Sequence, residues 1–173
     1  GKSHWVKQAL RDAGVTGNVE YIKGGTITAA ALYVKMFLNR MCHRILVLDD
    51  VDIIGHPDRN KIIPLILGAV EEGKNRLCSW NTAKRNALME EFDVPMEFEF
   101  NGCVILITNY TNNDIAEKLP QWKNAFKSRF VNTECVFNHE QKYMYTKHLV
   151  ENEDMLGSNC LVHDYKVDDV KIK

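Results

Sequence analysis

The sequence predicts an α/β fold in which helices flank a parallel central sheet. Short apolar runs, typical of buried strands, alternate along the chain with longer segments of helical periodicity. Apolar residues make up 45% of the 173 residues, so the chain can form one sizeable core but not two comfortable domains. We therefore expect one α/β core over residues 1–137, followed by a partial small helical subdomain or tail over residues 138–173.

The first half of the chain shows regular alternation of helix and strand patterns, separated by glycine-rich turns. The expected elements are a helix ending before Gly14, a strand at 19–22, a helix at 27–41, a strand at 44–48 and a helix from about 60 to 72. Pro64 falls in the first turns of the last helix, where proline is tolerated. This alternation favours parallel strands joined by helical crossovers.

The second half of the chain predicts a hairpin that feeds the core. Residues 96–100 alternate strictly between polar and apolar, Asn101-Gly102 is a tight-turn signal, and residues 103–108 read as a buried strand. These features together predict a β-hairpin over residues 96–108. The other expected elements are a short strand at 76–80, a helix or loop at 82–91, a helix at 115–126 interrupted at Pro120, a strand at 131–137 and a helix at 140–151.

The composition argues against several classes of protein. The formal net charge is −1, from 22 Lys and Arg against 23 Asp and Glu, so no global positive field favours nucleic acid. The five cysteines are odd in number and widely spaced, which predicts reduced, mostly buried thiols in a cytosolic protein. The histidines show no metal spacing. No stretch reaches the length of a membrane span and no signal-peptide pattern occurs, so we expect a cytoplasmic protein without a membrane partner.

The chain opens on Gly1-Lys2-Ser3, which matches the last three residues of a phosphate-binding P-loop. The lysine of such a loop reaches the terminal phosphates, and the hydroxyl ligates Mg²⁺. A helical pattern follows at once, as a P-loop requires, because the first N–H groups of the helix bind phosphate. The full pattern is Gly-x-x-x-x-Gly-Lys-Ser/Thr, so we expect the chain to be a fragment of a longer protein, or the ordered part of one.

Acidic and amide side chains follow two of the apolar strands. The run at 45–48 ends in Asp49-Asp50, and the run at 103–108 ends at Asn109. The carboxyl ends of parallel strands are where such sheets bind ligands, and an acid there can hold Mg²⁺ opposite the P-loop serine. This pairing predicts a nucleoside triphosphatase. The alternative for the two aspartates and the asparagine is an ordinary turn at the end of a strand.

These motifs, followed by Ser128-Arg129-Phe130 after a helix, stand in the order found in AAA+ ATPases, and the sequence resembles that family over about residues 1–150. The resemblance implies a P-loop NTPase fold of AAA+ type, with Asp49-Asp50 as Walker B and Asn109 as sensor 1. It implies that residues 138–173 form a partial lid. It also implies ATP and Mg²⁺ as ligands, and a homo-oligomeric ring of six subunits.

Four residues would bind the nucleotide and its metal ion by this resemblance. Gly1, Lys2 and Ser3 would bind ATP, with Lys2 at the β- and γ-phosphates. Ser3 and Asp49 would hold Mg²⁺.

Three residues would carry the hydrolysis by the same resemblance. Asp50 would polarise the attacking water, Asn109 would orient it, and Arg129 would neutralise transition-state charge in a neighbouring subunit, a contribution that reaches about 10³- to 10⁵-fold. The family usually has glutamate at the position of Asp50, so we expect either slow hydrolysis or an altered geometry at Asp50. No arginine follows Arg129, so the sensor 2 arginine of the family is absent, and either the lid is truncated or a lysine substitutes. Arg129 has the alternative of a surface salt bridge, and Asp52 that of a helix or turn cap.

Two segments bear on what the protein acts on. Gly24-Gly25 either faces a central channel or forms a turn that needs glycine. The hairpin lies where superfamily 3 helicases carry an insertion, and Lys84 and Arg85, with Lys74 and Arg76 further back, give this region positive charge. That charge can contact nucleic acid or can form an ordinary solvated face.

The sequence therefore predicts a Mg²⁺-dependent ATPase that acts in an oligomeric ring to remodel a protein or nucleic-acid substrate, in the style of viral or phage replication ATPases. A superfamily 3-like viral replicative helicase is one alternative, because it shares the same motifs. A non-catalytic nucleotide-dependent switch or assembly scaffold is an alternative of another class. For a viral protein, the expected location is the host cytoplasm.

Overall fold

The computed structural model describes residues 1–71, 76–81, 84–133, 138–141, 143–144 and 147. The chain divides into two compact units, Gly1–Thr133 and Glu134–Lys173. The first unit is a mixed α/β fold, as the alternation of patterns predicted. Residues 131–133 are not a strand, and the rest of the strand predicted at 131–137 lies outside the described residues, as does most of the predicted lid.

Three parallel strands form the central sheet in the order β1-β2-β5. They are β1 (Val19–Lys23), β2 (Ile45–Asp49) and β5 (Cys103–Ile107). The register places Lys23 beside Asp49, and Asp49 beside Ile107. The strands predicted at 19–22, 44–48 and 103–108 are confirmed, and all three end at the same edge of the sheet.

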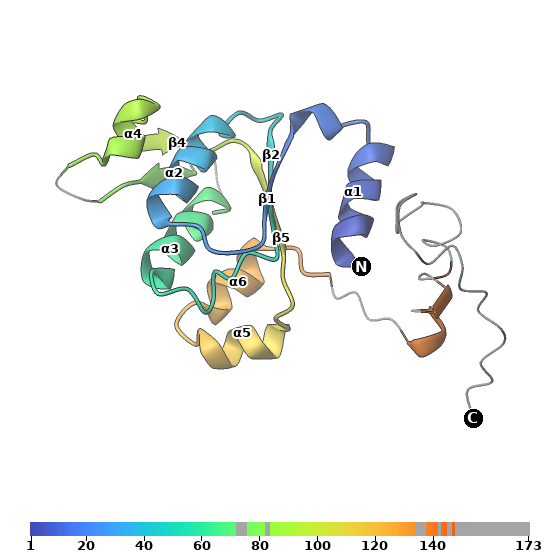
Figure 1. Cartoon of the computed structure of the whole chain (residues 1–173). Helices are drawn as coiled ribbons and strands as arrows, with labels where there is room; N and C mark the ends of the chain where they lie inside the picture. The colour runs from blue at the N-terminus through green and yellow to red at the C-terminus, as the bar shows by residue number, and fades with distance from the viewer. Residues whose placement is uncertain (72–75, 82–83, 134–137, 142, 145–146, 148–173) are drawn as a thin grey trace, which may run out of the picture. The chain divides into compact units, whose positions relative to one another are not determined.

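Helices cover both faces of this sheet. Figure 1 shows α1 (Lys2–Asp12) on one side and α2 (Ala29–Leu38) and α3 (Arg59–Ala69) on the other. On the α1 side, Leu10 packs with Val47 and Ile107. Because side chains alternate along a strand, the neighbouring residues of β2 point to the opposite face. This two-sided burial explains why β2 is apolar throughout until it reaches Asp49.

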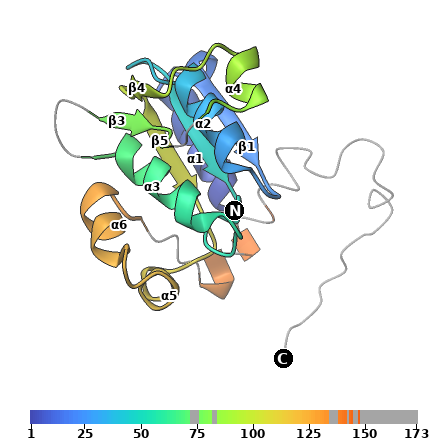
Figure 2. The ribbon, with the colours of Figure 1, turned by 90° about the vertical axis from the view of Figure 1, so that its left-hand side faces the viewer.

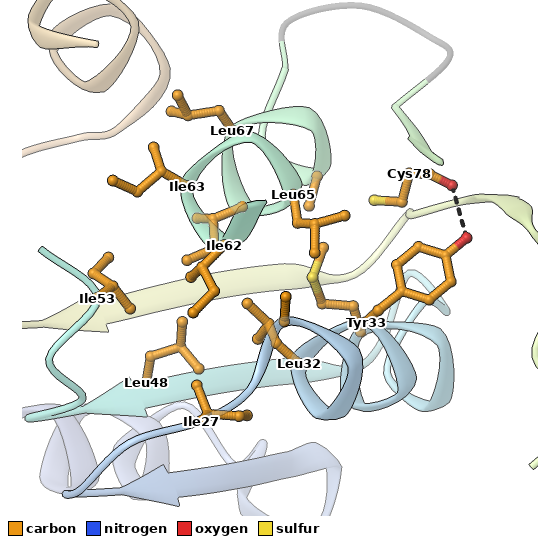
Figure 3. Packing of buried hydrophobic residues seen from close by; sticks show 14 of the residues in the cluster. Ile27, Leu32, Tyr33, Leu48, Ile53, Ile62, Ile63, Leu65, Leu67 and Cys78 are labelled. Carbon is orange, nitrogen blue, oxygen red and sulfur yellow. Dashed lines mark hydrogen bonds between the residues drawn. The ribbon is translucent and has the colours of Figure 1, made fainter. Parts of the chain in front are cut away.

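The larger core lies between the sheet and helices α2 and α3. Figure 3 shows Leu32 of α2, Leu48 of β2 and Ile62 of α3 meeting in this layer, and all three are 0% exposed. Burial of each such side chain contributes about 1.5 to 3 kcal/mol before entropy is counted. Helix α2 is shorter than the predicted 27–41, because Thr28 caps its start through a bond from Ala31 N–H at 3.2 Å and Asn39 ends it.

The prediction that residues 96–100 and 103–108 pair with each other as a hairpin is wrong. Strand β4 (Glu97–Glu99) pairs antiparallel with β3 (Leu77–Ser79), whereas β5 pairs with β2. The segment after β4 does not fold back, because Asn101 N–H donates to Arg40 O at 2.7 Å and Cys103 N–H donates to Arg44 O at 2.9 Å. These bonds lead the chain to the start of β2. The Asn101-Gly102 pair therefore connects two sheets.

The small β3-β4 sheet packs on helix α2. Phe98 of β4 lies 5.0 Å from Tyr33 and 5.3 Å from Phe37, measured between ring centroids. The Tyr33 hydroxyl lies within hydrogen-bond distance of the carbonyl oxygens of Cys78 (Figure 3) and Pro95, which share its single proton. Burial raises the pKa of this phenol. Helix α4 (Ala87–Glu91) lies between the two strands in sequence and occupies part of the segment predicted as helix or loop.

The helix predicted at 115–126 is two helices, α5 (Asn112–Lys118) and α6 (Lys123–Arg129). A capping box between Thr111 and Asp114 fixes the start of α5. The chain leaves helical geometry around Pro120, which lacks the backbone N–H that a continuous helix would need. Figure 2 shows α3 between the strand β3 and helix α6.

The prediction of mostly buried cysteines holds for Cys78 but is wrong for Cys42 and Cys103, which are exposed. Burial raises the pKa of the Cys78 thiol to about 12. The other two cysteines lie outside the described residues. In the part of the chain that the structure describes, no helix is long and apolar enough to cross a membrane.

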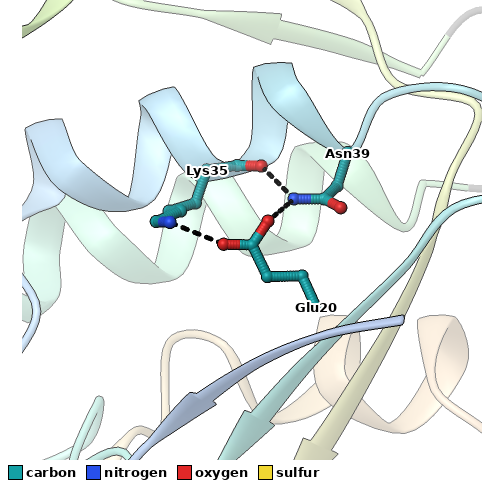
Figure 4. A network of polar contacts seen from close by, with 3 residues as sticks. All are labelled: Glu20, Lys35 and Asn39. Carbon is teal, nitrogen blue, oxygen red and sulfur yellow. Dashed lines mark hydrogen bonds and ion pairs between the residues drawn. The ribbon is translucent and has the colours of Figure 1, made fainter. Parts of the chain in front are cut away.

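A polar network fixes α2 against β1 (Figure 4). Glu20 of β1 accepts bonds from Lys35 Nζ and from Asn39 Nδ2, both at 2.5 Å, and Asn39 is 0% exposed. Burial alone would raise the pKa of Glu20, but the hydrogen bonds from Lys35 and Asn39 outweigh it and lower the pKa below the ordinary 4.5. The ionised carboxylate is therefore the form that stabilises the fold.

We expect Glu20→Gln to lower the free energy of unfolding by about 1 kcal/mol at pH 7, because it removes a charge-assisted acceptor. Since the pKa is lowered in the folded state, this contribution is present above pH 4.5 and is lost as the pH falls through the folded pKa. Urea unfolding of both proteins from pH 7 to pH 3 measures the difference. Asp58→Asn, which removes the exposed ion pair with Lys61, serves as the control with little change. A difference that grows toward low pH would contradict this account.

Candidate nucleotide-binding site

The common edge of the three strands places the predicted acidic and amide residues side by side. Asp49 is the last residue of β2, and Asn109 follows β5 by two residues. Asp50 N–H donates to Ile107 O at 3.0 Å, which holds the chain after β2 against the end of β5. Asp49 is 6% exposed, whereas Asp50 and Asn109 are exposed. One carboxylate is thus buried in the sheet edge and the other faces outward.

Helix α1 brings the Gly-Lys-Ser triplet to the same edge. Gly1 is its N-cap and the helix starts at Lys2, so the triplet opens a helix as predicted. The Ser3 hydroxyl donates to Asp49 Oδ1 at 2.6 Å, and Lys2 Nζ donates to Asn109 Oδ1 at 2.5 Å. These two bonds join the start of the chain to the ends of β2 and the segment after β5.

Asn109 connects the lysine to the outward aspartate. Its Oδ1 accepts from Lys2 and its Nδ2 donates to Asp50 Oδ1 at 2.9 Å. Lys2, Ser3, Asp49, Asp50 and Asn109 therefore lie together at one sheet edge, although 107 positions separate Lys2 from Asn109. Sequence spacing alone could propose this grouping but could not give its contacts.

The backbone of Asp50 adopts the left-handed conformation, with φ of +57°. Asp93 is the other non-glycine residue with positive φ among those the structure describes. A conformation of this kind costs a non-glycine residue about 1 to 3 kcal/mol and concentrates at functional sites. No pattern in the sequence pointed to this feature, because aspartate occurs both in ordinary turns and in strained ones.

A cavity of about 180 Å³ opens beside Asp50. Its lining residues come from the two segments that follow β2 and β5: Asp50, Val51, Asp52, Thr108, Asn109 and Tyr110. Asp52 Oδ1 accepts from Gly55 N–H at 2.7 Å, which confirms the predicted turn cap. The cavity offers room for water next to the Asp50 carboxylate, and Tyr110 is a lining residue that sequence reasoning missed.

The oxygen donors at this edge fit a magnesium ion held mainly by its nucleotide. Ser3 Oγ and Asp49 Oδ1 are adjacent, and no group of three or more His, Cys, Asp or Glu side chains suited to a metal occurs among the described residues. Mg²⁺ bound to a nucleotide uses one or two protein oxygens and takes its remaining ligands from phosphate and water. A hydroxyl beside one buried carboxylate satisfies that requirement.

Arg129 lies away from this cluster within its own chain. Its guanidinium donates to Leu67 O and to Glu71 Oε1, both at 2.9 Å, at the C-terminal end of α3. This contact matches the alternative of a salt-bridge partner. Gly24 and Gly25 have φ of +56° and +69°, so the loop after β1 is a turn that requires glycine. Gly24 N–H donates to Asp49 O at 2.8 Å and closes that turn onto the site.

The sequence is similar to that of a phage protein. It is 30% identical over 166 residues to the "Uncharacterized 36.7 kDa protein in nrdC-mobD intergenic region" of Enterobacteria phage T4. The match covers 93% of this chain and 50% of that protein, so the chain spans about half the length of this relative. No family model and no solved structure matches the chain.

We expect Asp50→Asn to leave stability nearly unchanged, because asparagine tolerates the left-handed backbone and retains an acceptor for Asn109. Asp50→Val should lower the free energy of unfolding by about 1 to 3 kcal/mol, because a β-branched residue is strained at positive φ. Thermal and urea unfolding of the two variants measure this. Glu99→Val, on the exposed face of β4, is the matched control and should be close to neutral. Equal stability of the two Asp50 variants would contradict the assigned conformation.

Proposed function

We propose that this protein is a P-loop ATPase of AAA+ type that binds ATP with Mg²⁺ and hydrolyses it. The observation that carries this proposal is the contact pattern in which Ser3 meets Asp49 while Asn109 bridges Lys2 and Asp50. A P-loop lysine and hydroxyl, a strand-end acid and a polar residue from the next strand are the groups that position a nucleoside triphosphate for attack by water. Their convergence supports one site rather than separate turns.

The nucleotide-binding part of the proposed mechanism uses the start of α1. The N-terminal N–H groups of the helix and the Lys2 ammonium group bind the phosphates by charge and hydrogen bonds. Ser3 Oγ and Asp49 Oδ1 would hold the metal ion, which would supply charge neutralisation to the phosphates. Lys2 exchanges its bond to Asn109 for a phosphate oxygen when the nucleotide arrives.

The hydrolytic part uses the side chains around the cavity. Asp50 accepts a hydrogen bond from the attacking water and draws its proton toward the carboxylate. Asn109 donates from its amide N–H group to Asp50 and accepts from Lys2 at its carbonyl oxygen. It thereby connects the residue proposed to bind water with the residue proposed to bind phosphate. The short aspartate at this position is consistent with slow turnover.

The mixed α/β unit with parallel strand order β1-β2-β5 is compatible with this family, and a phage relative supports a viral origin with action in the host cytoplasm. We further propose a homo-oligomeric ring, of six subunits, in which Arg129 reaches a neighbouring site after leaving Glu71. The substrate is a protein or a nucleic acid. A superfamily 3-like replicative helicase remains the nearest alternative within the same chemistry.

A nucleotide-dependent switch or scaffold is the second candidate, and one observation favours it. Arg129 makes two bonds to the end of α3 in its own chain, so the residue expected to complete a neighbour's site is already engaged. A switch would bind nucleotide and assemble without appreciable turnover. The two candidates therefore share the nucleotide-binding residues. They differ in whether the γ-phosphate is hydrolysed.

We expect the full-length protein to hydrolyse ATP in a Mg²⁺-dependent reaction whose rate rises more than linearly with protein concentration. Lys2→Ala should abolish nucleotide binding. Asp50→Asn should preserve binding and lower kcat by about 10²-fold or more, because it removes the group that draws the proton from water. Phosphate release and binding of a fluorescent nucleotide measure the two effects.

Asp52→Asn is the matched control, since Asp52 lines the same cavity but caps a turn and should retain most activity. Binding without turnover in the unaltered protein would identify the switch. Binding that survives Lys2→Ala unchanged would contradict the proposed site altogether.

A further inference from the structure

Three cations gather around one aromatic ring where α1 meets the edge strand β1. Lys7 and Arg11 lie one turn apart on α1, and Lys23 lies two residues after Tyr21, on the same face of β1. Lys7 Nζ lies over the Tyr21 ring, 5.8 Å from its centroid. We call Lys7, Arg11, Lys23 and Tyr21 the α1–β1 basic patch. Arg11 and Lys23 are exposed, and Lys7 and Tyr21 are half-buried.

In the part of the chain that the structure describes, the cations of the patch form no salt bridge with an acidic side chain. Within residues the structure describes, acidic side chains pair with Lys35, Lys61, Arg85 and Arg129, whereas none pairs with Lys7, Arg11 or Lys23. The neighbouring side chain of Lys23, followed by burial, lowers the pKa of Lys7, whereas the carboxylate of Asp49 acts in the opposite direction. The two ammonium groups are thus close enough to repel each other, and a bound anion would relieve that repulsion.

The region around Arg76 and Arg85, where the sequence suggested contact with nucleic acid, differs from this patch in its charge. Arg85 forms an ion pair with Asp93, and Arg76 donates to Gly102 O at 3.2 Å. Helix α4 and strand β4 of this region also carry four exposed acidic residues: Glu90, Glu91, Glu97 and Glu99. Among described residues this small sheet therefore favours no polyanion, whereas α1 and β1 bring three cations without a salt bridge around one aromatic ring.

We propose that single-stranded nucleic acid binds to the α1–β1 basic patch, with its phosphates on Lys7, Arg11 and Lys23 and a base against Tyr21. Such strands are bound by cations that follow the backbone, combined with aromatic rings on which bases stack. An acidic peptide would use the cations but not the ring. Among the described strands, β1 is an outer strand of the sheet, which suits it to contact with an extended ligand.

The patch adjoins the nucleotide site without sharing its residues. Lys23 lies beside Asp49 in the strand register, and Lys7 lies one helical turn after Ser3. A ligand on the patch would thus contact the two elements that hold the ATP-binding side chains. The proposal goes beyond the ATPase assignment and does not depend on it, because binding of an oligonucleotide is measured without nucleotide.

The test is fluorescence anisotropy of a labelled oligo-thymidine strand with the full-length protein, titrated between 50 and 200 mM salt. Three phosphate contacts predict a slope of about −2 for log K against log salt, at roughly −0.7 for each contact. We expect the triple variant Lys7→Gln, Arg11→Gln, Lys23→Gln to weaken binding by at least about tenfold and to reduce the slope by about 2. Its melting temperature should not fall below that of the unaltered protein, because the variant relieves the repulsion between Lys7 and Lys23.

The matched control is Lys61→Gln, Lys123→Gln, Lys127→Gln, which removes the same charge from exposed positions elsewhere and should bind with nearly unchanged affinity. No salt-dependent binding by the unaltered protein, or equal loss in both variants, would overturn the proposal. Binding of a fluorescent ATP analogue tests whether the patch binds the phosphates of ATP instead of those of a nucleic-acid strand. If the patch variant loses affinity for that nucleotide and not for the oligonucleotide, the patch serves the ATP site and the proposal fails.

Discussion

The candidate site depends on the parallel register of β2 between β1 and β5. Lys23, Asp49 and Ile107 are neighbours in that register, so the segments that follow the three strands leave the sheet at the same level. Because strand side chains alternate between faces, a shift of one residue in β2 would turn Asp49 away from α1 and Ser3. The buried side chains Leu46, Val47 and Leu48, each 0% exposed, fix the register against such a shift.

The polar contacts at the edge follow from this arrangement. Helix α1 packs on the face that Val47 and Ile107 share, and this packing sets the distance from Ser3 to Asp49. Asn109 then lies within reach of both Lys2 and Asp50. The site thus has a buried side, with Ser3 and Asp49, and an exposed side, with Asp50 and the cavity. That division separates the groups suited to phosphate and metal from the group suited to water.

Much of the sheet could be predicted from the sequence, because β2 and β5 come from continuous apolar runs that end in polar residues. Asp49, Asp50 and Asn109 were identified for the same reason. The partner of β4 could not be predicted, since Phe98 finds Tyr33 and Phe37 through contacts distant in sequence. The engagement of Arg129 with Leu67 and Glu71 also depends on how α6 packs on α3.

The backbone of Asp50 and the α1–β1 basic patch escaped sequence reasoning for different reasons. The positive φ of Asp50 cannot be predicted from the neighbouring residue types, because aspartate adopts several turn conformations. The patch combines residues four apart on a helix with residues two apart on a strand. Neither spacing by itself indicates a binding site. The four residues form a cluster only because α1 packs against β1.

The most direct test of the nucleotide site is paramagnetic broadening of backbone amide resonances by Mn²⁺, added below stoichiometry with a non-hydrolysable ATP analogue. Mn²⁺ prefers the same oxygen ligands as Mg²⁺ and broadens the signals of nearby residues. The account predicts that Ser3, Asp49 and Asn109 broaden first while Glu91 of α4 is unaffected. Broadening that appears elsewhere, or that does not require the nucleotide, would contradict a magnesium–nucleotide site at this sheet edge.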